Sequence, residues 1–316
     1  MTAAPQSSFR ASRAPRDIAG DITARILEDL DKGVLPWRKP WDSARTEPCL
    51  PRRATGAPYR GVNVVLLWST TVARGFRSPY WLSFRQAAAL GGHVRRGARG
   101  ERVVYYGHAA RTPPTADAHA PKESFRFLKS YVVFNADQIE ALPPHFHPGP
   151  VAGETMPEAS HDAWFAKLGI SRITTRDTAA YLPRRDVIAM PPPAAFDTPA
   201  HFAATLNHEA CHATGATHRL DRTLEARFGT QAYAAEELVA EIGAAILGAH
   251  LHLPPHHIHD HAAYIGCWMK LLQHDKRAFL TAAGKAQAAV DWLLAKSPAP
   301  AGATGASGDG GGDVET

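Results

Sequence analysis

Hydrophobic residues recur at helical spacing soon after the chain begins. Residues 1–16 are polar, basic and without a pattern, so we expect a flexible arm there. Isoleucine or leucine then occupies every fourth position from Ile18 to Leu30, and Gly33 follows. This spacing places the apolar side chains on one face and predicts an amphipathic helix over residues 17–30.

Two further helices are expected downstream. One begins at Asn63 and ends at Gly75, because glycine commonly stops a helix. The other is short and begins at Ser83, since Ser83 and Gln86 have the spacing of a capping box, and it ends before Gly91.

Strand patterns follow these helices. Residues 93–107 and 125–139 are rich in β-branched and aromatic residues, which favours two paired strands. The stretch 109–121 between them is rich in Pro, Ala and His, so we expect a mobile loop. Residues 144–160 contain Pro, Gly and Glu and are expected to form a linker.

The second half is predicted to be mainly helical. A helix near Trp164 and short strands at Ile173 and at residues 186–190 precede longer helices. Residues 262–296 form one or two of these helices. A tail rich in Gly, Ala and Ser follows, and we expect it to be disordered.

The segment TLNHEACHATG, residues 205–215, places two histidines four residues apart with Glu209 directly after the first. The segment Asp197-Thr198-Pro199 supplies a capping residue and a proline at the first helical position, and Gly215 is expected to end the helix. Residues i and i+4 lie on the same face of a helix, so both imidazoles can reach one ion.

This layout is typical of zinc peptidases. His208 and His212 would bind the metal, and Glu209 would act as the general base. With 17 histidines in the chain, a chance match to H-E-x-x-H arises in about one such sequence in 25, so the motif needs support from its context. Cys211 is expected to be a small buried residue that faces away from the imidazoles.

A third ligand is expected on the next helix, which contains AYAAEELVAEIGAAIL from Ala232. We predict Glu237 as the ligand and Glu241 as the residue that orients a ligating imidazole. Glu236 points about 100° away on the helical wheel and is the less favoured ligand. The alternative is that these three glutamates form a solvated acidic face.

Charge is unevenly divided along the chain. Residues 1–150 carry 22 Lys and Arg against 12 Asp and Glu, a net charge of +10, whereas residues 151–316 carry 13 against 18, a net charge of −5. The basic half suggests a polyanionic partner, and the acidic half containing the metal motif suggests a separate catalytic module.

Length and cysteine usage narrow the class of protein. At 316 residues and 45% hydrophobic content, the chain can form two domains. Cys49, Cys211 and Cys267 are odd in number and far apart, which argues for a reducing compartment. No segment resembles a membrane span or a leader peptide, so we expect a cytoplasmic protein without a membrane partner.

Aromatic and basic residues alternate in the first half, as in surfaces that bind nucleic acid by stacking and phosphate contacts. Exposed aromatic rings favour single-stranded DNA, whose bases are unstacked. Each tryptophan could instead be a core residue, and the arginine run could be a solvated turn. The candidate DNA-binding residues are Trp37, Arg38, Lys39, Trp41, Tyr59, Arg60, Trp81, Arg85, Arg95, Arg96 and Arg99.

Longer segments, taken in order, resemble one protein family. The first half contains PWRKPW, TGAPYRGVNVVLLW, SPYWLSFRQAAALGGHVRRGARGERVVYYG and YVVFNADQIEALP, and the second half contains AYLPRRDVIAMP, HEACHATGATHRLDR, AYAAEELVAEIGAAIL and HAAYIGCWMKLLQHDKRAF. The first set is similar to the N-terminal domain of ArdC-type antirestriction proteins, also found in TraC-type primases. The second set resembles the zincin-like metallopeptidase domain that follows it there.

The resemblance implies an α+β protein with two domains. The expected parts are a flexible arm (1–16), a basic domain that binds single-stranded DNA (17–143), a linker (144–160), a mainly helical zincin-like domain (161–296) and a disordered tail (297–316). His208, His212, Glu209 and the segment around Glu237 match the family's metal site. Ala210-Cys211 departs from the family's usual pattern, although neither residue is an expected ligand.

A histidine cluster is a second departure from the family pattern. It comprises His250, His252, His256, His257, His259 and His261. We expect a solvated loop there, with adventitious metal binding as the alternative. His261 and Tyr264 lie in a segment similar to the family, and either could stabilise an oxyanion.

The resemblance also implies a function in plasmid conjugation. The protein would bind single-stranded DNA, protect incoming DNA from restriction, and hydrolyse an unidentified protein substrate with Zn²⁺, or with Mn²⁺ or another divalent ion. Two alternatives stay open. One is a DNA-coating antirestriction protein whose metal site is only structural, and the other is an accessory of a replication enzyme or primase.

Overall fold

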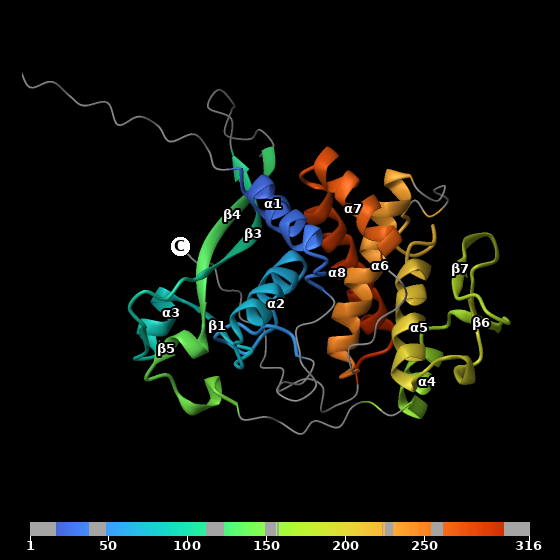
Figure 1. The fold of residues 1–316 in the computed structure, drawn as a ribbon, viewed down its shortest axis with the longest axis horizontal. Coiled ribbons are helices and arrows are strands. Elements are labelled where there is room, and N and C mark those ends of the chain that lie inside the picture. The colour runs from blue at the N-terminus through green and yellow to red at the C-terminus, as the bar shows by residue number, and fades with distance from the viewer. Residues whose placement is uncertain are drawn as a thin grey trace, which may run out of the picture.

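The computed structural model of the chain describes residues 17–37, 49–111, 123–148, 156, 158–222, 224, 230–253 and 262–299 (Figure 1). The expected arm and most of the expected loop over 109–121 lie outside these residues. Within the described ranges, no helix is long and apolar enough to cross a membrane.

The first half combines helices with a long strand pair. Its elements are α1 (Ile18–Asp31), α2 (Val62–Arg74), β1 (Trp81–Ser83), α3 (Phe84–Ala89), β2 (His93–Val94), β3 (Glu101–Arg111), β4 (Glu123–Asn135) and β5 (Ile139–Glu140), with 3₁₀ turns at Ala136–Gln138 and Pro144–Phe146. The helix expected over 17–30 is confirmed, with the carboxylate of Asp17 accepting from the N–H of Gly20 at 3.0 Å. The capping box of Ser83 and Gln86 is also present.

The second helix begins earlier than expected. Gly61 is its N-cap, and Asn63 lies inside the first turn, so the prediction that Asn63 begins the helix is wrong. The Asn63 amide instead donates to the carbonyl oxygen of Val104 and accepts from its N–H, both at 2.8 Å. These two hydrogen bonds tie α2 to β3. The helix ends at Gly75, as expected, and Gly75 is left-handed with φ 65°.

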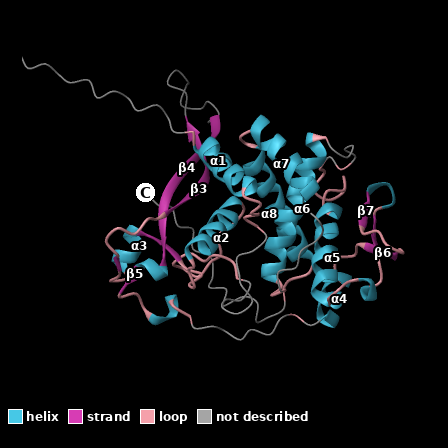
Figure 2. Ribbon diagram, viewed as in Figure 1, coloured by secondary structure: helices cyan, strands magenta, loops and turns pink. Residues whose placement is uncertain are grey.

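β3 and β4 form one long antiparallel pair, which confirms the predicted pairing. β1 lies on the other side of β4, so the strand order is β1-β4-β3, and Figure 2 shows this curved sheet beside α1 and α2. The strand expected over 93–107 is in fact two strands, because the chain turns at Gly97, where φ is 81°. The shorter piece, β2, pairs with β5.

The second half is mainly helical, as expected. Its elements are α4 (Glu158–Ala166), β6 (Ser171–Thr174), β7 (Ala180–Leu182), β8 (Val187–Met190), α5 (Pro199–Ala213), α6 (Gln231–His250), α7 (Ala262–His274) and α8 (Ala278–Lys296), with 3₁₀ turns at Pro183–Arg185 and Pro193–Ala195. β8 is the central strand of a small sheet, parallel to β6 and antiparallel to β7.

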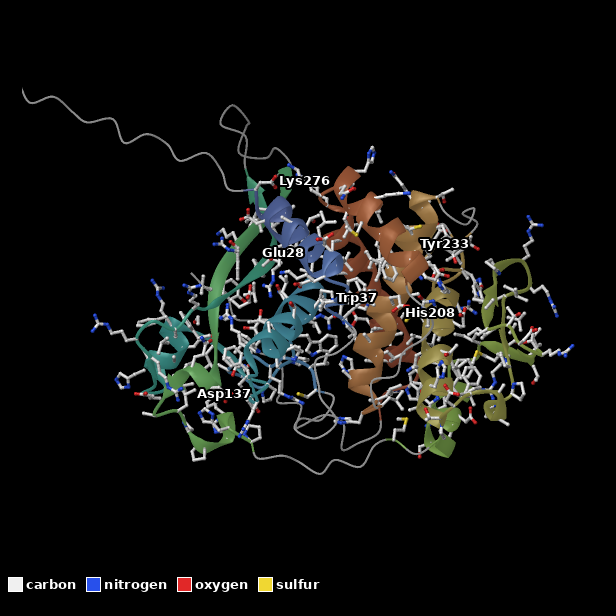
Figure 3. The ribbon with its side chains drawn as sticks, in the orientation of Figure 1. Glu28, Trp37, Asp137, His208, Tyr233 and Lys276 are labelled. Carbon is white, nitrogen blue, oxygen red and sulfur yellow. The ribbon has the colours of Figure 1, made fainter. Side chains whose placement is uncertain are left out.

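A continuous hydrophobic core runs through both halves. It joins buried side chains of α1, α2 and β3 to those of α5, α6, α7 and α8. Trp37 makes an edge contact with Trp268 of α7 at 5.5 Å between ring centroids, and it lies 5.9 Å from Phe279 of α8. Figure 3 shows Trp37 between the two sets of helices.

Polar contacts also join the halves. The hydroxyl of Thr23 donates to the carbonyl oxygen of Lys276 at 2.8 Å. The N–H of Gly61 donates to Oε1 of Gln287 at the same distance. The first contact joins α1 to the turn between α7 and α8, and the second joins the start of α2 to α8, so each half contributes to the other's packing.

Packed residues extend into the expected linker and into the expected tail. Phe146 is buried, and its carbonyl oxygen accepts from the Ser78 hydroxyl at 2.6 Å, so the first residues of the expected linker pack with the first half. Ser297 is also buried and exchanges hydrogen bonds with Trp164. The tail residues from 300 onward lie outside the described residues.

Candidate functional site

The metal motif lies on α5, which packs closely against α6. The Thr198 side chain accepts from the N–H of His201 at 3.1 Å, and Pro199 is the first helical residue, as predicted. A Cβ atom built on Gly243 of α6 would lie 2.8 Å from Sγ of Cys211, so only glycine permits this approach. Cys211 is fully buried, as expected, and burial raises the pKa of its thiol to about 12.

Three side chains from the two helices bring their ligand atoms together. Nε2 of His208 lies 3.1 Å from Nε2 of His212, and the carboxylate of Glu237 lies 3.5 Å from each. All the ligand atoms lie within 4.8 Å of one another. Ligands at the corners of a tetrahedron around Zn²⁺ are about 3.4 Å apart, so the donor set fits a divalent ion.

Two more glutamates of α6 face the outer nitrogens of these imidazoles. Oε1 of Glu241 lies 3.8 Å from Nδ1 of His208, on the side where we expected an orienting residue but too far for a hydrogen bond. Oε1 of Glu236 lies 3.3 Å from Nδ1 of His212. Glu237, which we favoured over Glu236 as the ligand, is the glutamate that lies near Nε2 of both histidines. The contact between Glu236 and His212 was not predicted.

The electrostatics of the cluster favour a cation. Burial alone would lower the pKa of His212, but the carboxylates of Glu236 and Glu237 raise it to about 10. The pKa of His208 is raised as well, because hydrogen bonding to Glu237 and nearby negative charge outweigh burial. The pKa of Glu237 is lowered, since the two imidazoles outweigh its burial. The carboxylates thus favour positive charge where the three ligand atoms meet, either as protons on the imidazoles or as a metal ion.

Glu209 is buried beside the cluster and is held by the strand β7. The N–H of Tyr181 donates to Oε2 of Glu209 at 2.6 Å. The Tyr181 hydroxyl donates to Asp186 at 2.7 Å, and Arg219 donates to both oxygens of Asp186 at 2.7 and 2.9 Å. Burial and the neighbouring Asp186 raise the pKa of Tyr181 to about 12, so its hydroxyl stays a donor. This network fixes β7 against α5.

Two tyrosines lie next to the metal ligands. The hydroxyls of Tyr233 on α6 and Tyr264 on α7 are 3.3 Å apart. Burial raises the pKa of both, and the negative charge of Glu237 raises both further. Figure 3 shows Tyr233 and His208 on adjacent helices. Tyr264 was expected near the site and Tyr233 was not, whereas His261 lies outside the described residues.

Three of the expected DNA-binding aromatic residues are core residues. The exposed fractions of Trp37, Tyr59 and Trp81 are 2%, 3% and 0%. They cannot stack on bases from these positions, so their assignment to a DNA surface is wrong. Their large apolar rings are buried in the hydrophobic core, which was the alternative considered from the sequence.

The expected basic residues are on the surface where they are described. Arg60, Arg85, Arg95, Arg96 and Arg99 are exposed. Arg60 pairs with Asp291 of α8. Arg95 lies 3.3 Å from Glu140. Arg38, Lys39 and Trp41 lie outside the described residues.

Exposed tyrosine rings lie elsewhere, on the β3–β4 ribbon. Tyr105 and Tyr131 are 56% and 42% exposed. Tyr105 is opposite Lys129, so the alternation of side chains places Tyr105, Phe127, Lys129 and Tyr131 on one face, here called the ribbon face. The ammonium group of Lys129 lies 4.9 Å from the centre of the Phe127 ring. Tyr106 is 55% exposed but points to the opposite face.

Only part of the histidine cluster is described. His250 ends α6, and burial lowers its pKa to about 4. His252 has a positive φ of 51°. His256, His257, His259 and His261 lie outside the described residues.

Comparison with known proteins identifies the class of both halves. Residues 159–285 match the family of zincin-like metallopeptidases, and residues 16–134 match the N-terminal domain of the anti-restriction factor ArdC. The chain therefore combines a zincin-like fold with an ArdC-type N-terminal domain.

Full-length relatives define the family. The chain is 41% identical to the antirestriction ArdC protein from R388 plasmid in its metal-free crystal structure, with a TM-score of 0.77 over 89% of this chain and 98% of that one. The Mn(II)-bound crystal structure of the same protein gives 40% identity and a TM-score of 0.74, over 90% of this chain and 99% of that one. The chain is also 37% identical to the uncharacterized protein y4eC of Sinorhizobium fredii (strain NBRC 101917 / NGR234), over 91% of this chain and 94% of the relative. This chain belongs to the ArdC antirestriction family.

A third relative is much longer than this chain. DNA primase TraC of Escherichia coli is 35% identical over 299 residues, which is 87% of this chain but only 27% of TraC. The similarity therefore concerns about a quarter of that protein.

Proposed function

We propose that this protein binds single-stranded DNA with its first half and hydrolyses a peptide bond in a protein substrate with its second half. Antirestriction is the function named for the ArdC relatives, and it is the function we infer here. The observation that carries the enzymatic part is the convergence of His208, His212 and Glu237 within 4.8 Å.

The metal would be held by these three side chains. Two imidazoles and one carboxylate are a donor set that Zn²⁺ accepts in catalytic sites, and the Mn(II)-bound relative supports a divalent ion in this family. An ion bound there would polarise a peptide carbonyl and make water more acidic. We favour Zn²⁺ because nitrogen ligands outnumber the single carboxylate.

Glu209 would act as the general base and then as the general acid. The N–H of Tyr181 engages Oε2, which fixes the plane of the carboxylate. Its position one residue after His208 keeps the carboxylate beside the three ligands. Glu209 would take a proton from the attacking water and pass it to the leaving amine.

Tyr233 and Tyr264 would stabilise the negative charge that develops on the carbonyl oxygen. Their raised pKa values keep both hydroxyls protonated at neutral pH, so each remains a hydrogen-bond donor. Tyr233 lies on α6, which also carries Glu237, and Tyr264 lies on α7, which packs against α6. We therefore extend the oxyanion role expected for Tyr264 to Tyr233.

The ribbon face would be the platform for single-stranded DNA. Tyr105 and Tyr131 offer exposed rings on which bases can stack, and Lys129 between them can contact phosphate. Three exposed residues of the first half would add positive charge for phosphate contacts: Arg85, Arg96 and Arg99. Coating of incoming conjugative DNA in the cytoplasm would place the protein where restriction enzymes act.

The test of this function compares the wild-type chain with Glu209→Gln in cells that express either. We expect new protein N-termini only with the wild-type chain, and full metal content in both. If the variant produces the same termini, Glu209 is not the base. If neither chain produces new termini and Glu209→Gln still protects DNA from restriction, the function is DNA coating around a structural metal site.

A further inference from the structure

A buried ion pair lies directly behind the second metal histidine. Nε of Arg222 donates to Oε2 of Glu236 at 3.1 Å, and Nη2 donates to Oε1 at 2.8 Å. Only 8% of Arg222 and 9% of Glu236 are exposed. A planar, two-pronged contact of this kind fixes both the position and the plane of the carboxylate.

Arg222 is itself anchored to the end of α5. Its Nη1 donates to Oγ1 of Thr214 at 2.8 Å, and its Nη2 donates to the carbonyl oxygen of Cys211 at 2.7 Å. A Cβ atom on Gly215 would lie 3.1 Å from Nη2, so the glycine leaves room for the guanidinium group. Gly215 directly follows the C-cap Thr214, where a glycine that ends the helix was expected, and its lack of a side chain also permits this close approach.

The fixed carboxylate determines which nitrogen of His212 faces the ligands. Oε1 of Glu236 lies 3.3 Å from Nδ1 of His212, and a carboxylate can only accept, so Nδ1 carries the hydrogen. Nε2, which faces His208 and Glu237, is then the nitrogen that offers its lone pair once a metal ion displaces its proton.

The first histidine lacks such a support. Nδ1 of His208 is buried, has no hydrogen-bond partner among the described residues, and is 3.8 Å from Glu241. Of the two imidazoles, His212 is therefore the one whose ring orientation is set in advance.

We propose that Arg222 and Glu236 are positioning residues that hold His212 ready for the metal. This inference rests on the proposed metal centre. Both oxygens of Glu236 are engaged by Arg222, so Glu236 acts through His212 and not as a ligand. If the ion pair were only a tie between α5 and α6, breaking it would lower stability but leave the affinity for metal unchanged.

The test measures the affinity of the full chain for Zn²⁺ by competition with a chelator. Glu236→Gln keeps the size of the side chain, but its amide group must face a donor of either Arg222 or His212. We expect metal binding to weaken about 10- to 100-fold, the range found when groups behind metal ligands are replaced. Arg222→Lys keeps the charge and loses the two-pronged contact, so we expect a smaller weakening.

The control is an ion pair in the first half, in which the carboxylate is buried and the guanidinium group is half-buried. Nη1 of Arg25 lies 2.6 Å from Oε1 of Glu101, and Glu101 is 8% exposed. Glu101→Gln and Glu236→Gln should both lower the melting temperature of the metal-free chain. Glu101→Gln should leave the affinity for Zn²⁺ unchanged. The absorption spectrum of the Co²⁺-loaded chain should change with Glu236→Gln and not with Glu101→Gln.

Two outcomes would overturn the inference, and they are distinguishable. If the wild-type chain binds no Zn²⁺, the metal centre itself is refuted and the positioning role falls with it. If wild type and Glu236→Gln bind Zn²⁺ equally and give the same Co²⁺ spectrum, the metal centre stands and the positioning role is refuted.

Discussion

The indole of Trp37 meets the indole of Trp268 edge to face, with 5.5 Å between ring centroids. One residue belongs to the first half and the other to α7 of the zincin-like half. Trp268 in turn stacks on Tyr264 at 5.8 Å, and the hydroxyl of Tyr264 lies beside that of Tyr233. The packing of the first half is therefore continuous with the walls of the metal site.

Trp37→Ala should destabilise the whole chain. The substitution removes a large buried ring, for which about 3–5 kcal/mol is typical. Because the core is shared, chemical denaturation should still show a single transition for signals from both halves. Phe84→Ala, which truncates a ring that is 63% exposed, serves as the control and should change stability by less than about 0.5 kcal/mol. Separate transitions of the two halves would contradict the shared core.

Gly243→Ala should push α5 and α6 apart. The added methyl would lie 2.8 Å from Sγ of Cys211, and overpacking of this kind costs about 1–3 kcal/mol. Metal affinity should fall with stability, because Glu237 lies on the displaced helix. Gly248→Ala, on the same helix with nothing within 4 Å of the new methyl, should instead stabilise the chain by up to about 1 kcal/mol. Equal effects of the two substitutions would refute the close approach.

The ribbon face can be tested with two adjacent tyrosines. Tyr105 and Tyr106 are 56% and 55% exposed but point to opposite faces. Tyr105→Ala should weaken binding of a single-stranded oligonucleotide about tenfold, since stacking on one ring contributes about 1–3 kcal/mol. Tyr106→Ala should leave the affinity within about twofold. The proposed face is wrong if Tyr106→Ala has the larger effect in a fluorescence anisotropy titration.

Stability should fall in mild acid because of His250. Its pKa is about 4 in the folded chain, against about 6.5 when unfolded, so below pH 6.5 the unfolded chain binds the proton more readily. Stability contributed by the neutral ring is complete above pH 6.5 and is lost as the pH falls toward 4. The loss should be about 2 kcal/mol greater for wild type than for His250→Asn. Parallel denaturation curves for the two chains across this range would contradict the assignment.

Local patterns predicted the elements that depend on neighbours in sequence. The periodicity from Ile18 to Leu30, the box of Ser83 and Gln86, and the cap at Thr198 are all present. Each arises from contacts within one helical turn or one helix face. The pairing of β3 with β4 was also predicted, since both segments are rich in β-branched and aromatic residues and are separated by a stretch rich in Pro, Ala and His.

Contacts between distant segments could not be predicted. No local pattern indicates that Trp37 packs on Trp268. The alternation of aromatic and basic residues therefore led to the expectation that the Trp37 ring is exposed. Glu236 was expected only as a less favoured ligand. Its carboxylate is held beside His212 by Arg222, which lies fourteen positions earlier in the chain, and no local pattern indicates this contact. The donor that holds Glu209 is the main-chain N–H of Tyr181, so the residue type at that position does not reveal the contact.

Metal content tests the central claim most directly. The full chain, dialysed against buffer after incubation with Zn²⁺, should retain one ion per chain as measured by inductively coupled plasma mass spectrometry. His212→Ala and Glu237→Ala should retain almost none, whereas Glu209→Gln should retain the ion. A wild-type chain without metal, or full retention by Glu237→Ala, would contradict a centre built from His208, His212 and Glu237.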